Sequence, residues 1–228
     1  MKIKIKREFF EEFEYTKENA TLLEVLEFIK EDLDNSLSFS SGCRSGICGS
    51  CAVRVNGKET LACGHKVQDS DTVEPLKHLK IIRDLVVDFD EAYKKNKQSL
   101  AFMQHYNKKE VSIDDEKINE LQSECILCGS CYSACPLLDV NTNFKGPFSL
   151  TRVWRYVSDK REDDLKTKID EVIKDGIWDC TLCNECTVVC PQNISSKADV
   201  EKLRIKATQL GHTDPNFNSF GFDGGLSF

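Results

Sequence analysis

The spacing of the cysteines constrains this chain more than any other feature. The 228-residue sequence contains twelve cysteines, and all of them fall into three groups of four. The first group has the spacing C-x4-C-x2-C-x11-C, and the other two share the spacing C-x2-C-x2-C-x3-C, each followed directly by a proline. In chain order the groups are Cys43, Cys48, Cys51 and Cys63; Cys125, Cys128, Cys131 and Cys135; and Cys180, Cys183, Cys186 and Cys190. No cysteine is left over, so the fold has to accommodate three sets of four cysteines.

The first group has the spacing of the ligands of a plant-type [2Fe-2S] cluster. Such a cluster needs four thiolates, and C-x4-C-x2-C followed by one later cysteine supplies them from a loop. Gly42, Gly46 and Gly49 lie among these cysteines, as expected where the backbone adopts positive φ angles and brings N–H groups close to sulfide. We therefore expect the four cysteines of this group to bind one [2Fe-2S] cluster.

The second and third groups predict two [4Fe-4S] clusters that exchange one ligand. In two-cluster ferredoxins, the first three cysteines of such a run bind one cluster and the fourth, before the proline, binds the other. The expected ligands of the first [4Fe-4S] cluster are Cys125, Cys128, Cys131 and Cys190. The expected ligands of the second are Cys180, Cys183, Cys186 and Cys135. This exchange would join the two runs through their cofactors.

Two other uses of the cysteines explain the spacing less well. Disulfides need an oxidising compartment, and cysteines separated by only two residues form strained bridges. Structural zinc is the stronger rival, but it usually pairs two C-x2-C units across an intervening segment, which gives no role to two C-x2-C-x2-C-x3-C-P runs. Clusters account for all three spacings.

Composition excludes several further function classes. The chain has 38 acidic and 31 basic residues and a formal net charge of -7, which argues against nucleic-acid binding. Its longest segment without a charged residue, Cys125 to Leu138, is too short and too polar for a membrane-spanning helix. No apolar stretch follows the basic N-terminal residues, so no secretory signal is expected. The sequence has no recognisable nucleophile–base pair, phosphate loop or flavin fingerprint, so the chain itself is expected to do no carbon chemistry.

Residues 1–88 are expected to form a β-grasp, ferredoxin-like domain in which one helix crosses a small sheet. Alternating polar and apolar residues predict strands, and Asn56-Gly57 predicts a tight hairpin turn. Thr21 and Glu24 form a capping box at the start of a helix that continues to Leu33. Strands are expected over residues 2–6, 11–15, 52–55, 60–62 and 72–74.

Residues 89–228 are expected to form an all-α domain that carries both [4Fe-4S] clusters, which makes the whole chain α+β. Helices are expected over residues 81–90, 114–124, 149–158, 165–175 and 200–209. Residues 89–112 are expected to wrap along the surface. The end of the chain contains Phe217, Phe220, Phe222 and Phe228. This tail is either an arm that orders against a partner or an untethered tail.

Four segments in this order resemble the iron-sulfur subunit of succinate dehydrogenase and fumarate reductase. They are Cys43 to Cys51 (CRSGICGSC), Ile82 to Asp88 (IRDLVVD) and the two later cysteine runs. The resemblance implies a subunit of an oxidoreductase complex of the succinate:quinone or quinol:fumarate class. Electrons would pass between an FAD-containing flavoprotein, the [2Fe-2S] cluster, the two [4Fe-4S] clusters and a quinone-reactive membrane partner. The [2Fe-2S] domain would face the flavin, and the second [4Fe-4S] cluster would face the membrane.

Two departures from the family pattern point to a subgroup. Most members lack the cysteine equivalent to Cys183 and hold a [3Fe-4S] cluster there, whereas the complete run in this chain predicts [4Fe-4S] with a lower potential. Most members also carry a tryptophan pair soon after the first Cys-Pro, and Pro136 is instead followed by Leu-Leu-Asp-Val. Both departures resemble thiol-driven and methylmenaquinol-type fumarate reductases, whose partner is cysteine-rich.

The resemblance also implies a location and leaves one alternative function. The chain would lie peripherally on a membrane through its partner subunits, on the cytoplasmic side by default, or on the periplasmic side if it is exported with a partner. The alternative is an iron-sulfur carrier for another flavoenzyme, or for a thiol-driven reductase, without a membrane quinone partner.

Five further residues have either two interpretations or a purely structural one. Gly146-Pro147 is expected to shape a turn. Arg152 and Arg155 would either form helix-surface salt bridges or face a quinone or an acidic partner. His65, two residues after Cys63, would either tune the [2Fe-2S] cluster through a hydrogen bond or lie on the surface.

Overall fold

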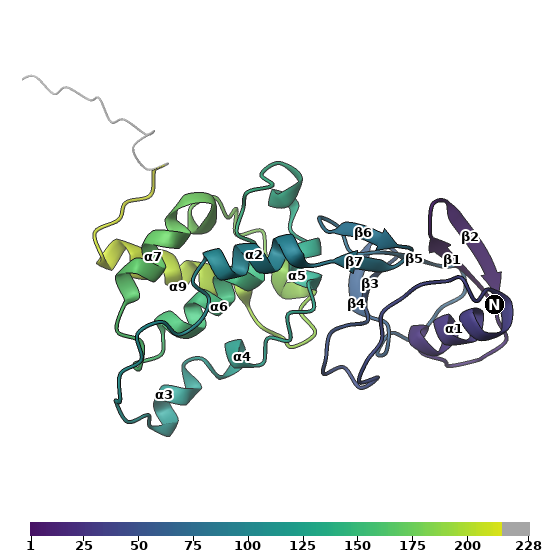
Figure 1. Cartoon of the computed structure of the whole chain (residues 1–228), viewed down its shortest axis with the longest axis horizontal. Coiled ribbons are helices and arrows are strands. Elements are labelled where there is room, and N and C mark those ends of the chain that lie inside the picture. The colour runs from purple at the N-terminus through teal and green to yellow at the C-terminus, as the bar shows by residue number, and fades with distance from the viewer. Residues whose placement is uncertain (216–228) are drawn as a thin grey trace, which may run out of the picture.

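Strands and helices separate along the chain. The computed structural model describes residues 1–215, and the strands lie at one end of an elongated molecule while most helices lie at the other (Figure 1). The four phenylalanines of the tail lie outside the described residues. The strands are β1 (Lys2–Lys6), β2 (Phe10–Glu14), β3 (Ala52–Val55), β4 (Lys58–Leu61), β5 (Asp71–Glu74), β6 (Lys80–Arg83) and β7 (Val86–Asp88). The expected α+β class is confirmed.

The helices follow the strands, apart from α1. They are α1 (Leu22–Phe28), α2 (Asp90–Gln98), α3 (Ile113–Lys117), α4 (Glu120–Ser123), α5 (Ser130–Ser133), α6 (Pro147–Val157), α7 (Leu165–Val172), α8 (Glu185–Val188) and α9 (Ser196–Gln209). A π-helical turn extends α1 over Ile29–Leu33, and a 3-10 turn covers Pro136–Asp139. The segment Ile173–Ile177 after α7 is kinked, because Lys174, Asp175 and Gly176 have non-helical backbone angles. None of the helices within residues 1–215 is long and apolar enough to cross a bilayer.

The N-terminal sheet has the strand order β2-β1-β5-β3-β4, with β1 and β5 parallel and the other neighbours antiparallel. The β3–β4 hairpin turns at Asn56 and Gly57, whose φ angles of 49° and 82° are those of a type I′ turn. Helix α1 begins at the expected capping box of Thr21 and Glu24. Its apolar face packs with Ile3 and Ile5 of β1 in the first hydrophobic core.

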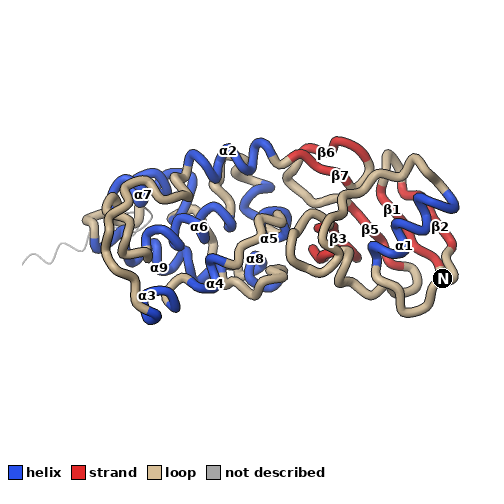
Figure 2. Tube along the Cα trace, turned by 60° about the horizontal axis from the view of Figure 1, so that its bottom comes forward, coloured by secondary structure: helices blue, strands red, loops and turns tan. Residues whose placement is uncertain are grey.

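A second hydrophobic core lies among the helices, most of which gather at the end of the molecule away from the sheet (Figure 2). Helix α6 contributes Phe148, Leu150 and Val153, which pack with Val200 and Leu203 of α9. This arrangement sets α6 and α9 side by side as the frame of the helical part. Both were expected from the sequence, although α9 begins four residues earlier than predicted.

The predicted helix over residues 81–90 is wrong. This segment forms the β6–β7 hairpin, which turns at Asp84 with a φ angle of 49°. Its apolar residues are mostly β-branched, which favours strands, and Leu85 is buried in the first core. The carboxylate of Asp84 fixes the turn by accepting hydrogen bonds from Arg7 Nε (3.0 Å) and Ser38 N (2.8 Å).

Several helix boundaries also differ from the prediction. Helix α2 falls in the segment that was expected only to wrap along the surface, and Ala92 is its one buried residue. The predicted helix over 114–124 is divided into α3 and α4 at Asn119, whose φ angle is -131°. Helix α7 stops at Val172, and Asp175 in the following turn has a φ angle of 52°.

A buried ion pair fixes the segment after α2 to the helical part. Lys168 of α7 and Glu162 have fully buried side chains, and Lys168 Nζ lies 3.2 Å from Glu162 Oε2. Lys168 also donates to the carbonyl oxygens of Leu100 (3.0 Å) and Phe102. Glu162 accepts the backbone N–H group of Gln104 (2.7 Å). The pair therefore satisfies backbone groups that would otherwise be buried without partners.

Replacing Lys168 by Met should strongly destabilise the protein. The substitution leaves the Glu162 carboxylate buried without its cation, which costs about 3–5 kcal/mol and lowers the melting temperature by roughly 6–20 °C. The matched control is Lys166→Met on the same helix, because Lys166 forms an exposed pair with Asp170 (2.7 Å), which is worth at most about 0.5 kcal/mol. Thermal melting of the two variants compares them, and equal melting temperatures would contradict the proposed role of the pair.

Candidate iron-sulfur cluster sites

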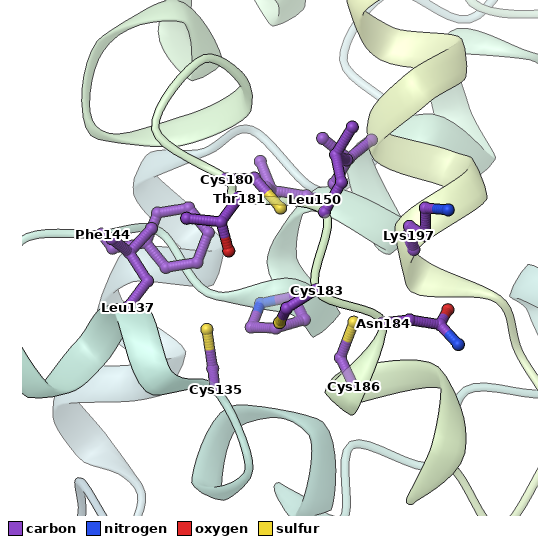
Figure 3. A pocket seen from close by; sticks show the side chains of 13 residues that line it. Cys135, Leu137, Phe144, Leu150, Cys180, Thr181, Cys183, Asn184, Cys186 and Lys197 are labelled. Carbon is purple, nitrogen blue, oxygen red and sulfur yellow. The ribbon is translucent and has the colours of Figure 1, made fainter.

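Four cysteines from both C-x2-C-x2-C-x3-C runs line one cavity. They are Cys135, Cys180, Cys183 and Cys186, the four expected at the second [4Fe-4S] cluster. Figure 3 shows their sulfur atoms around a shared space. This space has an empty volume of about 400 Å³, part of it open to solvent, and buried Phe144 and Leu150 are among the residues that line it. Most of its lining residues are cysteines or apolar residues, and Thr181, Asn184 and Lys197 are the polar ones. Four thiols are the donor set that holds an iron-sulfur cluster.

The other four cysteines of these runs line a second cavity. They are Cys125, Cys128, Cys131 and Cys190, the four expected at the first [4Fe-4S] cluster. Phe148, Thr151 and Ile194 complete its wall. The structure therefore brings the last cysteine of each run, Cys135 or Cys190, into the cavity of the other run.

The two runs fold in the same way because residues at equivalent positions of each run adopt a left-handed backbone conformation. In the first run Leu127 and Gly129 have φ angles of 53° and 81°, and in the second Leu182 and Asn184 have φ angles of 56° and 76°. These reversals turn three successive cysteines toward one side of the loop. Gly129 is also required by space, because a Cβ atom there would lie 2.6 Å from the Phe89 ring.

Burial makes these thiols poor acids as long as nothing compensates their charge. It raises the pKa of the Cys135 thiol to about 11 and that of the Cys186 thiol to about 12, and it raises the pKa of Cys131 as well. Metal ligation requires thiolates, and iron supplies the positive charge that stabilises them. Among the described residues, no three cysteine, histidine or acidic side chains converge on a position for a single metal ion. In a cubane each thiolate binds a different iron, so the ligands can lie further apart.

The first two cysteines of the first group, Cys43 and Cys48, lie on an exposed loop. Cys43 Sγ accepts the backbone N–H groups of Ser45, Ile47 and Cys48 at distances of 3.2–3.4 Å. Hydrogen bonds from this loop, with those of Ser45 largest, lower the pKa of Cys43 to about 6. Donors of this kind stabilise negative charge on sulfur, as a bound cluster requires.

The remaining two cysteines of this group lie on neighbouring segments at the sheet edge. Cys51 is buried just before β3, and Cys63 follows β4. The N–H group of Ala62, next to Cys63, donates to the carbonyl oxygen of Cys51 (2.9 Å). The hairpin register thus brings together cysteines that are twelve positions apart.

The glycines among these cysteines differ in their roles. Gly46 and Gly49 have the expected positive φ angles of 77° and 72°. Gly42 does not, so the expectation of positive φ is wrong there. A side chain at Gly42 is excluded for another reason, since its Cβ atom would lie 2.9 Å from Cys48 Sγ.

The residues with two interpretations differ in their contacts. The His65 imidazole lies 2.9 Å from Asp71 Oδ2 of β5. Within the described residues, Arg152 Nε is buried without a hydrogen-bond partner, and the Arg152 charge lies close enough to act against the burial that raises the pKa of Cys125. Arg155 lies over the Tyr156 ring, 5.2 Å from its centre. Neither arginine forms the salt bridge that the sequence suggested with a described residue. Gly146 has a φ angle of 89° directly before α6, as expected for a turn.

Two residues near the sites carry no sequence signal. Asp199 of α9 is fully buried and accepts a hydrogen bond from Gln122 Nε2 (2.7 Å), and burial raises its pKa to about 6 although Lys202, Thr151 and Gln122 act against that shift. Arg204 donates to the carbonyl oxygens of Ile177 (2.8 Å) and Cys180 (2.6 Å). Arg204 thus holds the loop of the second cavity, which only the tertiary structure reveals.

Comparisons with known proteins agree with this geometry. Residues 2–94 match the family described as "2Fe-2S iron-sulfur cluster binding domain", and residues 121–194 match the "4Fe-4S dicluster domain". The 8-methylmenaquinol:fumarate reductase iron-sulfur subunit of Wolinella succinogenes is 38% identical over 210 residues, which cover 85% of this chain and 66% of that subunit. The fumarate reductase iron-sulfur subunit of Haemophilus influenzae is 34% identical, with 83% of this chain and 82% of that subunit covered.

A solved structure has the same fold. The Mycobacterium smegmatis Sdh1 complex in the apo form contains a chain that superposes with a TM-score of 0.82 at 20% identity, covering 93% of this chain and 97% of that chain. The present chain spans less than half of the length of three other curated relatives that it matches.

Replacing Cys183 by Ala should change the cluster in the cavity of Figure 3. Three thiols remain there, so we expect the oxidised variant to give the electron paramagnetic resonance (EPR) signal of a three-iron cluster and to lose about one iron atom per chain. The matched control is Thr181→Ala, because Thr181 lines the same cavity without a thiol. A strong three-iron signal at full occupancy in the oxidised native protein would contradict the four-thiol site.

Proposed function

We propose an electron-relay function for this chain, which belongs to the iron-sulfur subunits of the succinate dehydrogenase and fumarate reductase family. In this proposal it connects an FAD-containing flavoprotein with a quinone-reactive or cysteine-rich membrane partner. The observation that carries the proposal is the exchange of Cys135 and Cys190 between two cavities lined by four thiols each. This arrangement suits two neighbouring clusters in one rigid unit, as a relay needs.

The proposed ligand sets are those expected from the cysteine spacing. The [2Fe-2S] cluster would be held by Cys43, Cys48, Cys51 and Cys63. The first [4Fe-4S] cluster would be held by Cys125, Cys128, Cys131 and Cys190, and the second by Cys180, Cys183, Cys186 and Cys135. When bound, the clusters supply one-electron redox chemistry.

The protein's own residues hold, insulate and orient these sites. Phe144 and Leu150 exclude water from one side of the second cavity, and Phe148 and Ile194 do so at the first. The low polarity of these walls affects the potential of a bound cluster. Arg204 keeps the Cys180 loop in place through its backbone carbonyl groups.

Cys183 supports a four-iron cluster at the second site. It lies on the wall of the same cavity as the other three thiols, so a fourth iron has a ligand. Relatives named for 8-methylmenaquinol and for CoM/CoB, which are 38% and 32% identical to this chain, support the subgroup with the cysteine-rich type of partner. In this proposal the chain is peripheral and reaches the membrane through its partners.

The proposal predicts a flavoprotein partner. Affinity purification of the tagged chain from its native cells should recover a larger subunit with bound FAD, and succinate or a reduced quinol should then reduce the clusters in the purified complex. Flavin absorbance measures the bound FAD, and the bleaching of the cluster absorbance under anaerobic conditions measures the reduction of the clusters. A stable, flavin-free monomer that carries clusters would contradict the proposal and favour the independent electron carrier.

A further inference from the structure

The [2Fe-2S] loop touches the first [4Fe-4S] cavity at Gly49. This residue lies between Cys48 and Cys51 and is buried, although most of its loop is exposed. A Cβ atom at Gly49 would lie 2.7 Å from Cβ and 3.1 Å from Cα of Cys128. Cys128 lines the cavity of the first [4Fe-4S] site. The backbone of one candidate site therefore lies directly against a candidate ligand of the next, with no side chain between them.

A second contact joins the same two sites from the other cysteine run. Gln192, two residues after Cys190, lines the first [4Fe-4S] cavity. Its Nε2 donates to the carbonyl oxygen of Gly46 in the [2Fe-2S] loop (3.3 Å). The loop thus lies against the cavity at two glycines. Cys128 of the first run contacts Gly49, and Gln192, just after the second run, binds Gly46.

We propose that Gly49 is a positioning residue that sets the spacing between the [2Fe-2S] cluster and the first [4Fe-4S] cluster, with Gln192 holding the loop in place. The inference rests on the proposed relay function. Electron tunnelling falls exponentially with the distance between donor and acceptor, so a relay depends on the closest spacing that the chain allows. Glycine gives that spacing because any side chain would separate the two sites.

Cys128 leaves no room for a side chain at Gly49. Carbon atoms in contact lie about 3.5–4.0 Å apart, so a methyl group at Gly49 needs about 1 Å more room than it has. Two of the three nearest opposing atoms are Cβ and Cα of Cys128, which the adjacent site fixes and which cannot rotate away. The third, Ile126 Cδ1 at 3.2 Å, is the end of a flexible side chain and can turn aside. The [2Fe-2S] loop must therefore move away from the cavity.

Gly46 provides a matched control in the same loop. Its φ angle of 77° is close to the 72° of Gly49, so alanine imposes a similar backbone strain at either position. A Cβ atom at Gly46, however, would meet nothing within 4 Å. The difference between Gly49→Ala and Gly46→Ala thus isolates the contact with Cys128 from the strain of the loop.

The test compares native protein, Gly49→Ala, Gly46→Ala and Gln192→Leu, each as the full chain with its clusters and with iron and sulfide contents measured. EPR spectra of the fully reduced proteins report the magnetic interaction between the two reduced clusters, which weakens with the cube of their distance. Rapid-mixing kinetics report electron transfer between the clusters. We expect Gly49→Ala to lose most of the interaction and to slow the transfer several-fold. Gly46→Ala keeps the carbonyl oxygen that accepts from Gln192 and should lose much less of the interaction than Gly49→Ala. Gln192→Leu should also show a smaller loss than Gly49→Ala.

The outcomes separate this inference from the proposed function. A native interaction in Gly49→Ala, or an equal loss in Gly46→Ala, would overturn the role of Gly49. If Gly49→Ala does not retain its [2Fe-2S] cluster, Gln192→Leu decides: a weakened interaction supports the inference and a native one overturns it. If native protein carries three clusters that do not interact, the inference is overturned. The proposed function is then still tested by the search for a flavoprotein partner. Native protein without clusters overturns the relay itself.

Discussion

In the proposed relay, charge compensation between buried thiolates and iron is the interaction on which the structure depends. Eight cysteines surround two cavities in the helical part, and burial raises the pKa of several of them, to about 12 for Cys186. Eight such thiolates cannot share so small a volume unless a metal neutralises their charge. Because Cys135 and Cys190 cross between the cavities, loss of one cluster would also remove a contact that joins the two runs. We therefore regard the cofactors as part of the core, flanked by α6 and α9.

Polar contacts between the two halves of the chain hold the cysteine-lined sites in a fixed arrangement. Besides the contacts at Gly49 and Gln192, Ser133 of α5 donates to Glu59 of β4 (2.7 Å) and accepts the backbone N–H group of Lys77 (2.8 Å). A buried hydroxyl thus joins the sheet, the segment before β6 and the helix that carries Cys131. Polar contacts of this kind favour one register between the halves, which a distance-dependent transfer needs.

Much of the fold and of the cysteine sites could be predicted from the sequence because the relevant signals are local. The capping box of Thr21 and Glu24 and the turn at Asn56-Gly57 depend on a few neighbouring residues, and both are where the sequence places them. The spacing of the cysteines predicted which four would meet at each cavity, and their role as ligands stays a prediction. The β6–β7 hairpin was missed because its short apolar run fits a helix as well as a strand. Asp199, Arg204 and the contact of Gly49 with Cys128 depend on elements far apart in the sequence, so no pattern within one segment reveals them.

Iron and acid-labile sulfide analysis of the chain, purified under strictly anaerobic conditions, tests the central claim most directly. One [2Fe-2S] and two [4Fe-4S] clusters predict about ten iron atoms and about ten sulfide ions per chain. A colourless protein without sulfide, or with zinc in place of iron, would contradict the account.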